Sequence, residues 1–185
     1  MQTDKNRWRK DLKRLRQEIP GSLRKQNNLD IRRNLLSLQG LGDAKSIFCF
    51  VSYGAEVDTH GIIDELLRQG KQLAVPKITE SRLMNAIQFQ DWGDLEAGEL
   101  GILSPRWATA IIDKFDVTIT PGLGFTERGD RLGFGRGYYD AWFRKNDPGL
   151  KIALSYEAQI NANLPVEAHD VKVDIIVTEE RIIRV

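Results

Sequence analysis

The chain of 185 residues has only one cysteine, Cys49, so it cannot form an internal disulfide. A lone thiol suits a reducing compartment, and its place in the apolar run 47–51 favours a buried strand residue over a nucleophile. No stretch approaches the roughly 20 apolar residues that cross a membrane. The charged first residues are not followed by the apolar segment of a secretory signal. We therefore expect a cytoplasmic protein without a membrane partner.

Several common functional motifs are also missing. There is no G-x-x-x-x-G-K-[ST] phosphate loop, and the glycines lack the G-x-G-x-x-G spacing of a dinucleotide site. No serine lies in the G-x-S-x-G context of a hydrolase nucleophile. The two histidines, His60 and His169, lack the spacing of zinc ligands. The net charge is only +1, so bulk electrostatics do not indicate a nucleic-acid partner.

Hydrophobic periodicity predicts a single α/β domain over residues 1–185. It indicates helices near 5–17, 22–40, 61–69 and 138–145, and strands near 45–53, 71–76, 83–89, 115–120, 151–156, 171–178 and 181–185. A strand, a helix and a second strand follow one another within about thirty residues, as in a βαβ unit. We expect three layers around a mostly parallel, Rossmann-like sheet. Ligands in such sheets bind beyond the carboxyl ends of the strands, here near Glu56, the loop 120–140 and the turn after Tyr156.

The loop 120–140 reads TPGLGFTERGDRLGFGRGYYD and is the most distinctive segment of the chain. Glycine reaches positive φ at little cost and lets a ligand approach the backbone closely. A glycine-rich loop that runs into a helix N-terminus also presents free N–H groups, which suit phosphate. Nearby positive charge comes from Arg128, Arg131 and Arg136. The sequence therefore favours a phosphate site, with a plain flexible turn as the alternative.

Four charged residues carry further hypotheses. Lys5 and Arg9 are four residues apart and share one helix face, where they could reach an anion together. Asp140 lies in a first helical turn, where the helix dipole favours a carboxylate even without a ligand. Asp174 lies in the apolar run 173–177, and a buried carboxylate is costly unless it is paired or bound to metal. A metal role and an ion pair with Arg181 or Arg184 are both open for Asp174.

The chain resembles the family of 5-formyltetrahydrofolate cyclo-ligases, also called 5,10-methenyltetrahydrofolate synthetases, over nearly its whole length. The most specific match is P-G-L-G-F-T-E-R-G-D-R-L-G-F-G-R-G-Y-Y-D at 121–140. Lys5-x-x-x-Arg9, the segment 56–59 and the final strand 171–178 also match. Ser104 stands where many relatives have glutamate, so we assign no role to 101–105.

This resemblance implies a monomeric ligase that closes the ring of 5-formyltetrahydrofolate with ATP and Mg²⁺. It places ATP against Lys5, Asn6, Arg7, Trp8, Arg9, Arg131, Leu132, Gly133, Phe134, Gly135, Arg136, Gly137, Tyr138 and Tyr139. It places the folate against Val51, Glu56, Phe134, Gly135, Arg136, Gly137 and Tyr138. It implies Mg²⁺ ligands at Asp140 and Asp174, and catalytic roles for Arg131, Arg136 and Tyr138.

Two other classes of function are open to the same sequence. A nucleic-acid-binding module could use the basic first helix, but Asp4, Asp11 and Glu18 interrupt its charge. A sugar-phosphate isomerase or an acyl-transfer enzyme could use the glycine loop for a substrate phosphate. That alternative leaves Lys5, Arg9 and Asp174 without roles.

Overall fold

The computed structural model describes residues 2–79, 81, 83–98, 101–107, 110–167 and 169–185. The described residues form an eight-stranded sheet with the order β12-β11-β10-β7-β1-β2-β3-β6. Its five inner strands are parallel: β1 (Ser46–Cys49), β2 (Gln72–Ile78), β7 (Val117–Thr120), β10 (Leu150–Leu154) and β11 (Ile175–Val177). The antiparallel strands lie at the edges: β3 (Met84–Phe89), β6 (Ile111–Ile112) and β12 (Ile182–Arg184). The expected α/β class with a mostly parallel sheet is confirmed.

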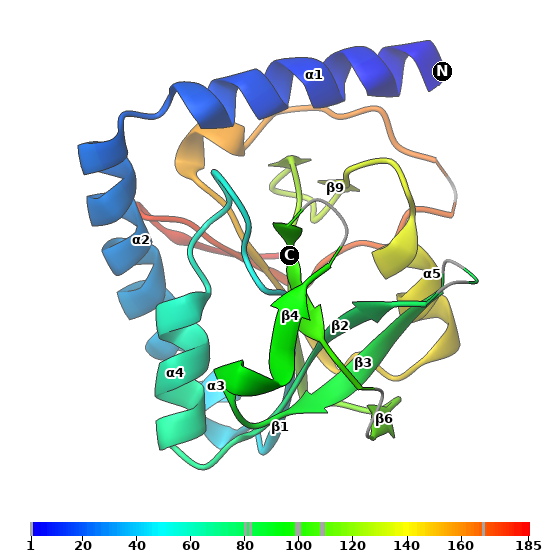
Figure 1. Ribbon diagram of the computed structural model, residues 1–185. Helices are drawn as coiled ribbons and strands as arrows, with labels where there is room; N and C mark the ends of the chain where they lie inside the picture. Colours follow the sequence, from blue (N-terminus) through cyan, green and yellow to red (C-terminus); the bar gives the residue numbers. More distant parts are fainter. Residues whose placement is uncertain (1, 80, 82, 99–100, 108–109, 168) are drawn as a thin grey trace.

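Helices cover both faces of this sheet, which gives the three expected layers (Figure 1). On one face, α2 (Gly21–Leu36) and α4 (His60–Arg68) bury Ile31, Leu35 and Ile62 against strand residues such as Ile47. On the other face, α5 (Tyr138–Lys145) packs Trp142 against Phe48, with ring centroids 4.8 Å apart. Strands that are covered on both sides need continuous apolar runs rather than alternation, as the fully buried β7 shows. A short α3 (Gln39–Asp43) follows α2.

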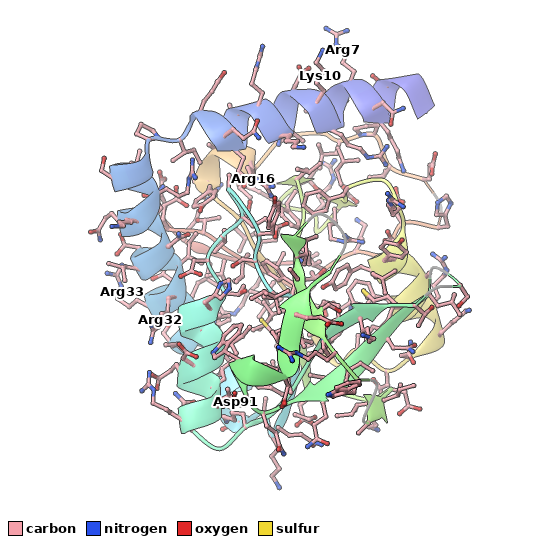
Figure 2. All side chains as sticks on the ribbon, viewed as in Figure 1. Arg7, Lys10, Arg16, Arg32, Arg33 and Asp91 are labelled. Carbon is pink, nitrogen blue, oxygen red and sulfur yellow. The ribbon has the colours of Figure 1, made fainter. Side chains whose placement is uncertain are left out.

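The first helix, α1 (Gln2–Glu18), lies across one end of the sheet (Figure 1). Its inward residues are Lys5, Arg9, Leu12 and Arg16, spaced four, three and four apart as one helical face requires. Lys5, Leu12 and Arg16 are buried, whereas Leu15 is exposed. Figure 2 shows Arg7 and Lys10 pointing away from the rest of the molecule. The face toward the protein is therefore mostly cationic, because it covers polar loops rather than the core.

The glycine-rich loop is more ordered than its composition indicates. Its first half is a hairpin of β8 (Gly124–Phe125) and β9 (Arg131–Leu132), so irregular backbone is confined mainly to residues 133–137. The sequence also gave no sign of the short strands β4 (Leu95–Ala97) and β5 (Leu103–Pro105) or of the 3₁₀ turns η1 (Trp92–Asp94) and η3 (Glu157–Gln159). Elements of two or three residues are too short to show a period.

The strand order places a topological switch between β1 and β7. The chain runs from β1 through α4 to β2 on one side of β1, and later returns to its other side as β7. The loops that leave the carboxyl ends of β1 and β7 therefore diverge, which is where open α/β sheets bind ligands. Among the described residues, no helix combines the length and apolar character needed to cross a membrane.

Candidate active site

The loops after β1, β7 and β10 meet beneath α1, as we expected (Figure 1). Gln159, after β10, donates from Nε2 to the carbonyl of Leu123 at 2.6 Å, and the N–H of Asn161 donates to the carbonyl of Phe125 at 2.8 Å. The Tyr156 hydroxyl lies 3.3 Å from the carbonyl oxygen of Glu56, which belongs to the loop after β1. These contacts hold the three loops together at the carboxyl edge of the sheet.

The shared face of Lys5 and Arg9 is confirmed, and each side chain reaches a different loop. Lys5 Nζ lies 2.7 Å from Asp170 Oδ2 and 3.0 Å from Glu167 Oε2. Burial works to raise the pKa of Asp170, but the hydrogen bonds from Lys5 and from the N–H of Glu167, together with the nearby charges of Lys5 and His169, outweigh it, so that pKa lies below its usual value. Arg9 donates from Nε to the carbonyl of Gly133 at 3.0 Å. The first helix is thus tied directly to the glycine-rich loop.

Neither Asp170 nor Glu167 was among the residues expected from the sequence. Both lie in an irregular stretch more than 160 positions from Lys5, and a pairing over that distance leaves no local pattern. Of the other ATP residues expected on α1, Asn6 and Arg7 are exposed, whereas Trp8 is half-buried and packs against the cluster of Leu12, Leu123, Leu132 and Leu164. Asn6 does accept a hydrogen bond from Arg9 Nη1 at 2.8 Å, so it helps to orient that guanidinium.

The end of the glycine-rich loop is an exposed backbone segment at the start of α5. Gly135 has φ +102°, and a Cβ added there would lie 3.2 Å from Arg9 Cζ. Gly137 has φ +67° and caps α5 without a side-chain hydrogen bond. Phe134 and Arg136 are exposed on this segment. Main-chain N–H groups beside a cation and a helix N-terminus can bind phosphate oxygens.

Arg131 lies beneath this segment rather than on it. It is buried, and its Nη2 lies 2.8 Å from Asp140 Oδ1. Its Cζ lies 5.8 Å from the ring centroid of Tyr139. Burial raises the pKa of Tyr139 well above its usual value. Three buried polar atoms here have no hydrogen-bond partner among the described residues: Thr120 Oγ1, Arg131 Nε and the Tyr139 hydroxyl. Tyr138, at the start of α5, is half-buried.

The two expected metal ligands have different partners and places. Asp140 Oδ1 also accepts the N–H of Val171 at 3.1 Å, in the first turn of the helix that follows β7. Asp174 precedes β11, level with Lys151 at the start of β10, and its Oδ2 lies 2.7 Å from Lys151 Nζ. Asp174 therefore lies at the amino ends of these strands and pairs with Lys151 rather than with an arginine. Asp174 directly precedes this strand, because only 175–177 of the expected strand 171–178 is a strand.

Asp170 directly precedes Val171, whose N–H bonds to Asp140. Among the residues that the structure describes, three possible metal ligands have atoms within 4.8 Å of one another: Glu167, His169 and Asp170. Lys5 already occupies two of them. The metal role of Asp174 stays a prediction.

Glu56 lies on the first loop, with its side chain 13% exposed. Its Oε2 accepts the N–H of Tyr53 at 2.9 Å, and its Oε1 lies 3.9 Å from Arg16 Nη1. Burial raises the pKa of Glu56, against the lowering effects of the Tyr53 N–H and of Arg16. Val51, which directly precedes this loop, is buried in the core. Arg16 was not expected from the sequence, although its place on the face of Lys5, Arg9 and Leu12 was a usable signal.

The chain shares its sequence and its fold with known proteins. The model of the 5-formyltetrahydrofolate cyclo-ligase family matches residues 1–179. The chain belongs to this family. The cyclo-ligase of Mus musculus is 27% identical over 189 residues, which cover 93% of this chain and 92% of that protein. A probable cyclo-ligase of Schizosaccharomyces pombe is 32% identical over 146 residues, covering 70% and 72%.

Solved structures of the same family have the same fold. The 5,10-methenyltetrahydrofolate synthetase of Aquifex aeolicus matches with a TM-score of 0.87 and 30% identity, covering 97% of this chain and 92% of that chain. The synthetase of Mycoplasma pneumoniae matches with a TM-score of 0.77 and 22% identity, covering 95% and 99%. The resemblance seen in the glycine-rich loop is confirmed, and membership of a cyclo-ligase family makes the chain an enzyme of the ligase class.

Proposed function

We propose that this cyclo-ligase converts 5-formyltetrahydrofolate and ATP to 5,10-methenyltetrahydrofolate, ADP and phosphate, with Mg²⁺. The observation that carries the proposal is the placement of Glu56 and of the glycine-rich loop under one cationic helix face. A carboxylate suits the N–H edge of a pterin, and cations with free N–H groups suit a triphosphate. Family membership, shown by residues 1–179, supplies the reaction class.

The chemistry explains why both sites are needed in one place. A formamide oxygen is a poor leaving group, so the formyl oxygen first takes the γ-phosphoryl group as the bond to ADP breaks. N10 of the folate then attacks the formyl carbon, the carbon–oxygen bond breaks, and phosphate leaves with that oxygen. The proton of N10 is released, and the product is the cyclic amidinium. Phosphoryl transfer of this kind depends mainly on positioning and on neutralising charge.

The phosphates lie, in this proposal, against the inward face of α1 and the end of the glycine-rich loop. Arg9 and Arg136 supply charge, the amides of 133–137 supply N–H groups, and Lys5 reaches the same region through Asp170. The remaining contacts to ATP come from Asn6, Trp8, Leu132, Phe134, Tyr138 and Tyr139, whereas Arg7 points outward. Arg131 supports the site by holding Asp140 in place.

The folate lies on the other side of this loop. Glu56 accepts the N–H edge of the pterin, beside Val51. The backbone of 134–137 and the Tyr138 side chain lie between the folate and the phosphates. Tyr138 and Arg136 are therefore the residues that face the reacting groups.

The carboxylates near the loop fit a hard divalent cation, because Mg²⁺ prefers oxygen ligands and is usually held by one or two carboxylates together with phosphates. Asp140 would hold Mg²⁺, and Asp170, which directly precedes the residue bonded to Asp140, is proposed as the second ligand in place of the expected Asp174. The ion would neutralise charge on the transferred phosphoryl group.

The test is an assay of the purified chain with 5-formyltetrahydrofolate, ATP and Mg²⁺, followed by the near-ultraviolet absorbance of the methenyl product. We expect absorbance to rise only when all three are present, with one phosphate released per ring closed. Ribose phosphates and acyl donors serve as substrates for the alternative functions. Turnover of one of these with no folate product would contradict the proposal. Sedimentation of the same sample tests the expected monomer.

A further inference from the structure

We propose that Arg16 is a substrate-recognition residue that donates hydrogen bonds to the 4-oxo group of the pterin, beside the N–H edge that Glu56 accepts. The proposal rests on the proposed function, and it adds the determinant that distinguishes a 4-oxo pterin from a 4-amino one. Arg16 lies in the last turn of α1, away from the Lys5 end of the helix.

The first observation is a buried guanidinium without a hydrogen bond. Arg16 is 6% exposed, its Nε is fully buried, and no other described residue accepts a hydrogen bond from it. Guanidinium has five N–H donors, and burying them unpaired is costly. Lys5 bonds to Asp170, and Arg131 bonds through Nη2 to Asp140 although its Nε also has no partner. Arg16 differs because none of its nitrogens donates a hydrogen bond to a described residue, so all its donors are left for a ligand.

The second observation is its surroundings. Arg16 Nη1 lies 3.9 Å from Glu56 Oε1, which is too long for a hydrogen bond but places the two groups side by side. Its Cζ lies 5.5 Å from the centroid of the Phe134 ring, on the glycine-rich loop. Tyr156 and Arg24 are the other titratable groups close to the Arg16 guanidinium. Arg16 therefore lies between Glu56, which the proposed function assigns to the pterin, and Phe134, whose backbone it places between the folate and the phosphates.

The chemistry of the pterin edge matches this pair. A 4-oxo pterin presents its 2-amino group and N3–H as donors, followed directly by the carbonyl oxygen at C4 as an acceptor. A carboxylate can take the two donors, and a neighbouring guanidinium can donate to the carbonyl. A 4-amino group in that place would turn its own N–H groups toward a cation that has no acceptor. An arrangement of this kind discriminates because a mismatched analogue leaves buried polar groups unpaired.

The experiment is calorimetry of the full chain with 5-formyltetrahydrofolate and with its 4-amino-4-deoxy counterpart, for wild type and Arg16→Gln. We expect Arg16→Gln to weaken binding of the 4-oxo ligand about 10- to 100-fold, as the loss of a charge-assisted hydrogen bond implies. Binding of the 4-amino ligand should not weaken. A structural role for Arg16, through Glu56 or the position of α1, would weaken both ligands equally, and that result would overturn the proposal.

Two matched variants complete the design. Arg24→Gln alters a neighbouring half-buried arginine whose Nη2 donates to the carbonyl of Ile19 at 2.8 Å, so it should change both affinities by the same small factor. Arg16→Lys keeps the charge and tests the assignment if Arg16→Gln does not fold. Arg16→Lys should weaken binding of the 4-oxo ligand less than Arg16→Gln does and leave binding of the 4-amino ligand unchanged. Equal losses for both ligands would count against the assignment. If wild type binds neither ligand, the proposed function itself fails and this inference fails with it.

Discussion

At the scale of single residues, three cations on one face of α1 have three different environments. Lys5 is held by two carboxylates, Arg9 by a loop carbonyl, and Arg16 by no hydrogen bond to another described residue. The sequence predicted the shared face of Lys5 and Arg9 from their spacing. It could not show which partners they meet, because those partners come from loops that only the fold brings beneath the helix.

Asp174 is a second residue whose partner and exposure the sequence did not reveal. The apolar residues around it suggested a buried carboxylate, but its side chain is 40% exposed at the start of a strand and pairs with Lys151. Asp170, four positions earlier, bonds to Lys5 and directly precedes Val171, whose N–H bonds to Asp140. Sequence patterns give the existence of a strand more reliably than its ends, and the role of these carboxylates depends on where the strand begins.

The metal site can therefore be tested with three asparagine variants. We expect Asp140→Asn and Asp170→Asn to move the Mg²⁺ midpoint of ring closure to higher concentration with ATP saturating. Asp174→Asn removes only a partly exposed ion pair, so it should cost about 1 kcal/mol or less of stability and leave the midpoint unchanged. Glu167→Gln is the control, because it also removes a partner of Lys5. A shifted midpoint in Asp174→Asn, with Asp170→Asn unchanged, would restore the pairing expected from the sequence.

The Glu56 carboxylate is proposed to bind the pterin, and its burial lowers the stability of the folded chain. Glu56→Gln keeps the size but replaces an acceptor with a donor, so affinity for the folate should fall about 10-fold or more while ATP affinity is kept. Calorimetry with each ligand alone measures this. Unchanged folate affinity would remove Glu56 from the pterin site.

The same variant should change how stability depends on pH. Burial raises the pKa of Glu56 above its ordinary value of 4.5, so the folded chain holds this proton more tightly than the unfolded chain. Wild type therefore loses stability as the pH rises from that value through the folded pKa, whereas glutamine does not titrate. Over the pH range in which a buried carboxyl group titrates, from about pH 4 to neutral pH, the melting temperature of wild type should fall relative to that of Glu56→Gln. A constant difference between the two proteins would show that burial does not penalise the Glu56 carboxylate.

At the scale of elements, the function depends on the contact between α1 and the glycine-rich loop. The sequence predicted α5 with its observed bounds, because apolar spacing and the Asp-Pro-Gly after it mark both ends. It did not predict the β8–β9 hairpin, whose two-residue strands are defined by pairing with each other. The hairpin confines the irregular, glycine-dependent backbone to the part of the loop that faces Arg9.

Arg9 and Arg7 form a matched pair for testing this contact. Both were expected to bind ATP, but Arg9 bonds to Gly133 on the inward face while Arg7 points outward (Figure 2). Arg9→Ala should raise the KM for ATP about 10-fold or more, since a charge-assisted contact contributes roughly 1.5–3 kcal/mol. Arg7→Ala should change it by a factor of about two or less. Equal effects in steady-state assays would show that the outward face of α1 also contacts the nucleotide.

At the scale of the whole molecule, the strand order brings the carboxylate proposed to bind the pterin and the glycine-rich loop proposed to bind phosphate to one edge of the sheet. The loop after β1 carries the carboxylate, the loop after β7 carries the glycines, and α1 closes over both. The alternation of strands and helices predicted this edge correctly, because parallel strands place all their carboxyl ends together. The position of α1 was not predictable in the same way, since its inward face is cationic and only the completed loops provide its partners.

The central claim is that the formyl oxygen is phosphorylated and leaves as part of phosphate. The most direct measurement uses 5-formyltetrahydrofolate with ¹⁸O in the formyl group, ATP and Mg²⁺, followed by mass spectrometry of the inorganic phosphate. A parallel reaction with unlabelled substrate in ¹⁸O-water controls for hydrolysis of ATP by solvent. The account predicts one ¹⁸O in each phosphate released with ring closure, and no label from the water. Methenyl product formed with ATP consumption but with unlabelled phosphate would contradict it.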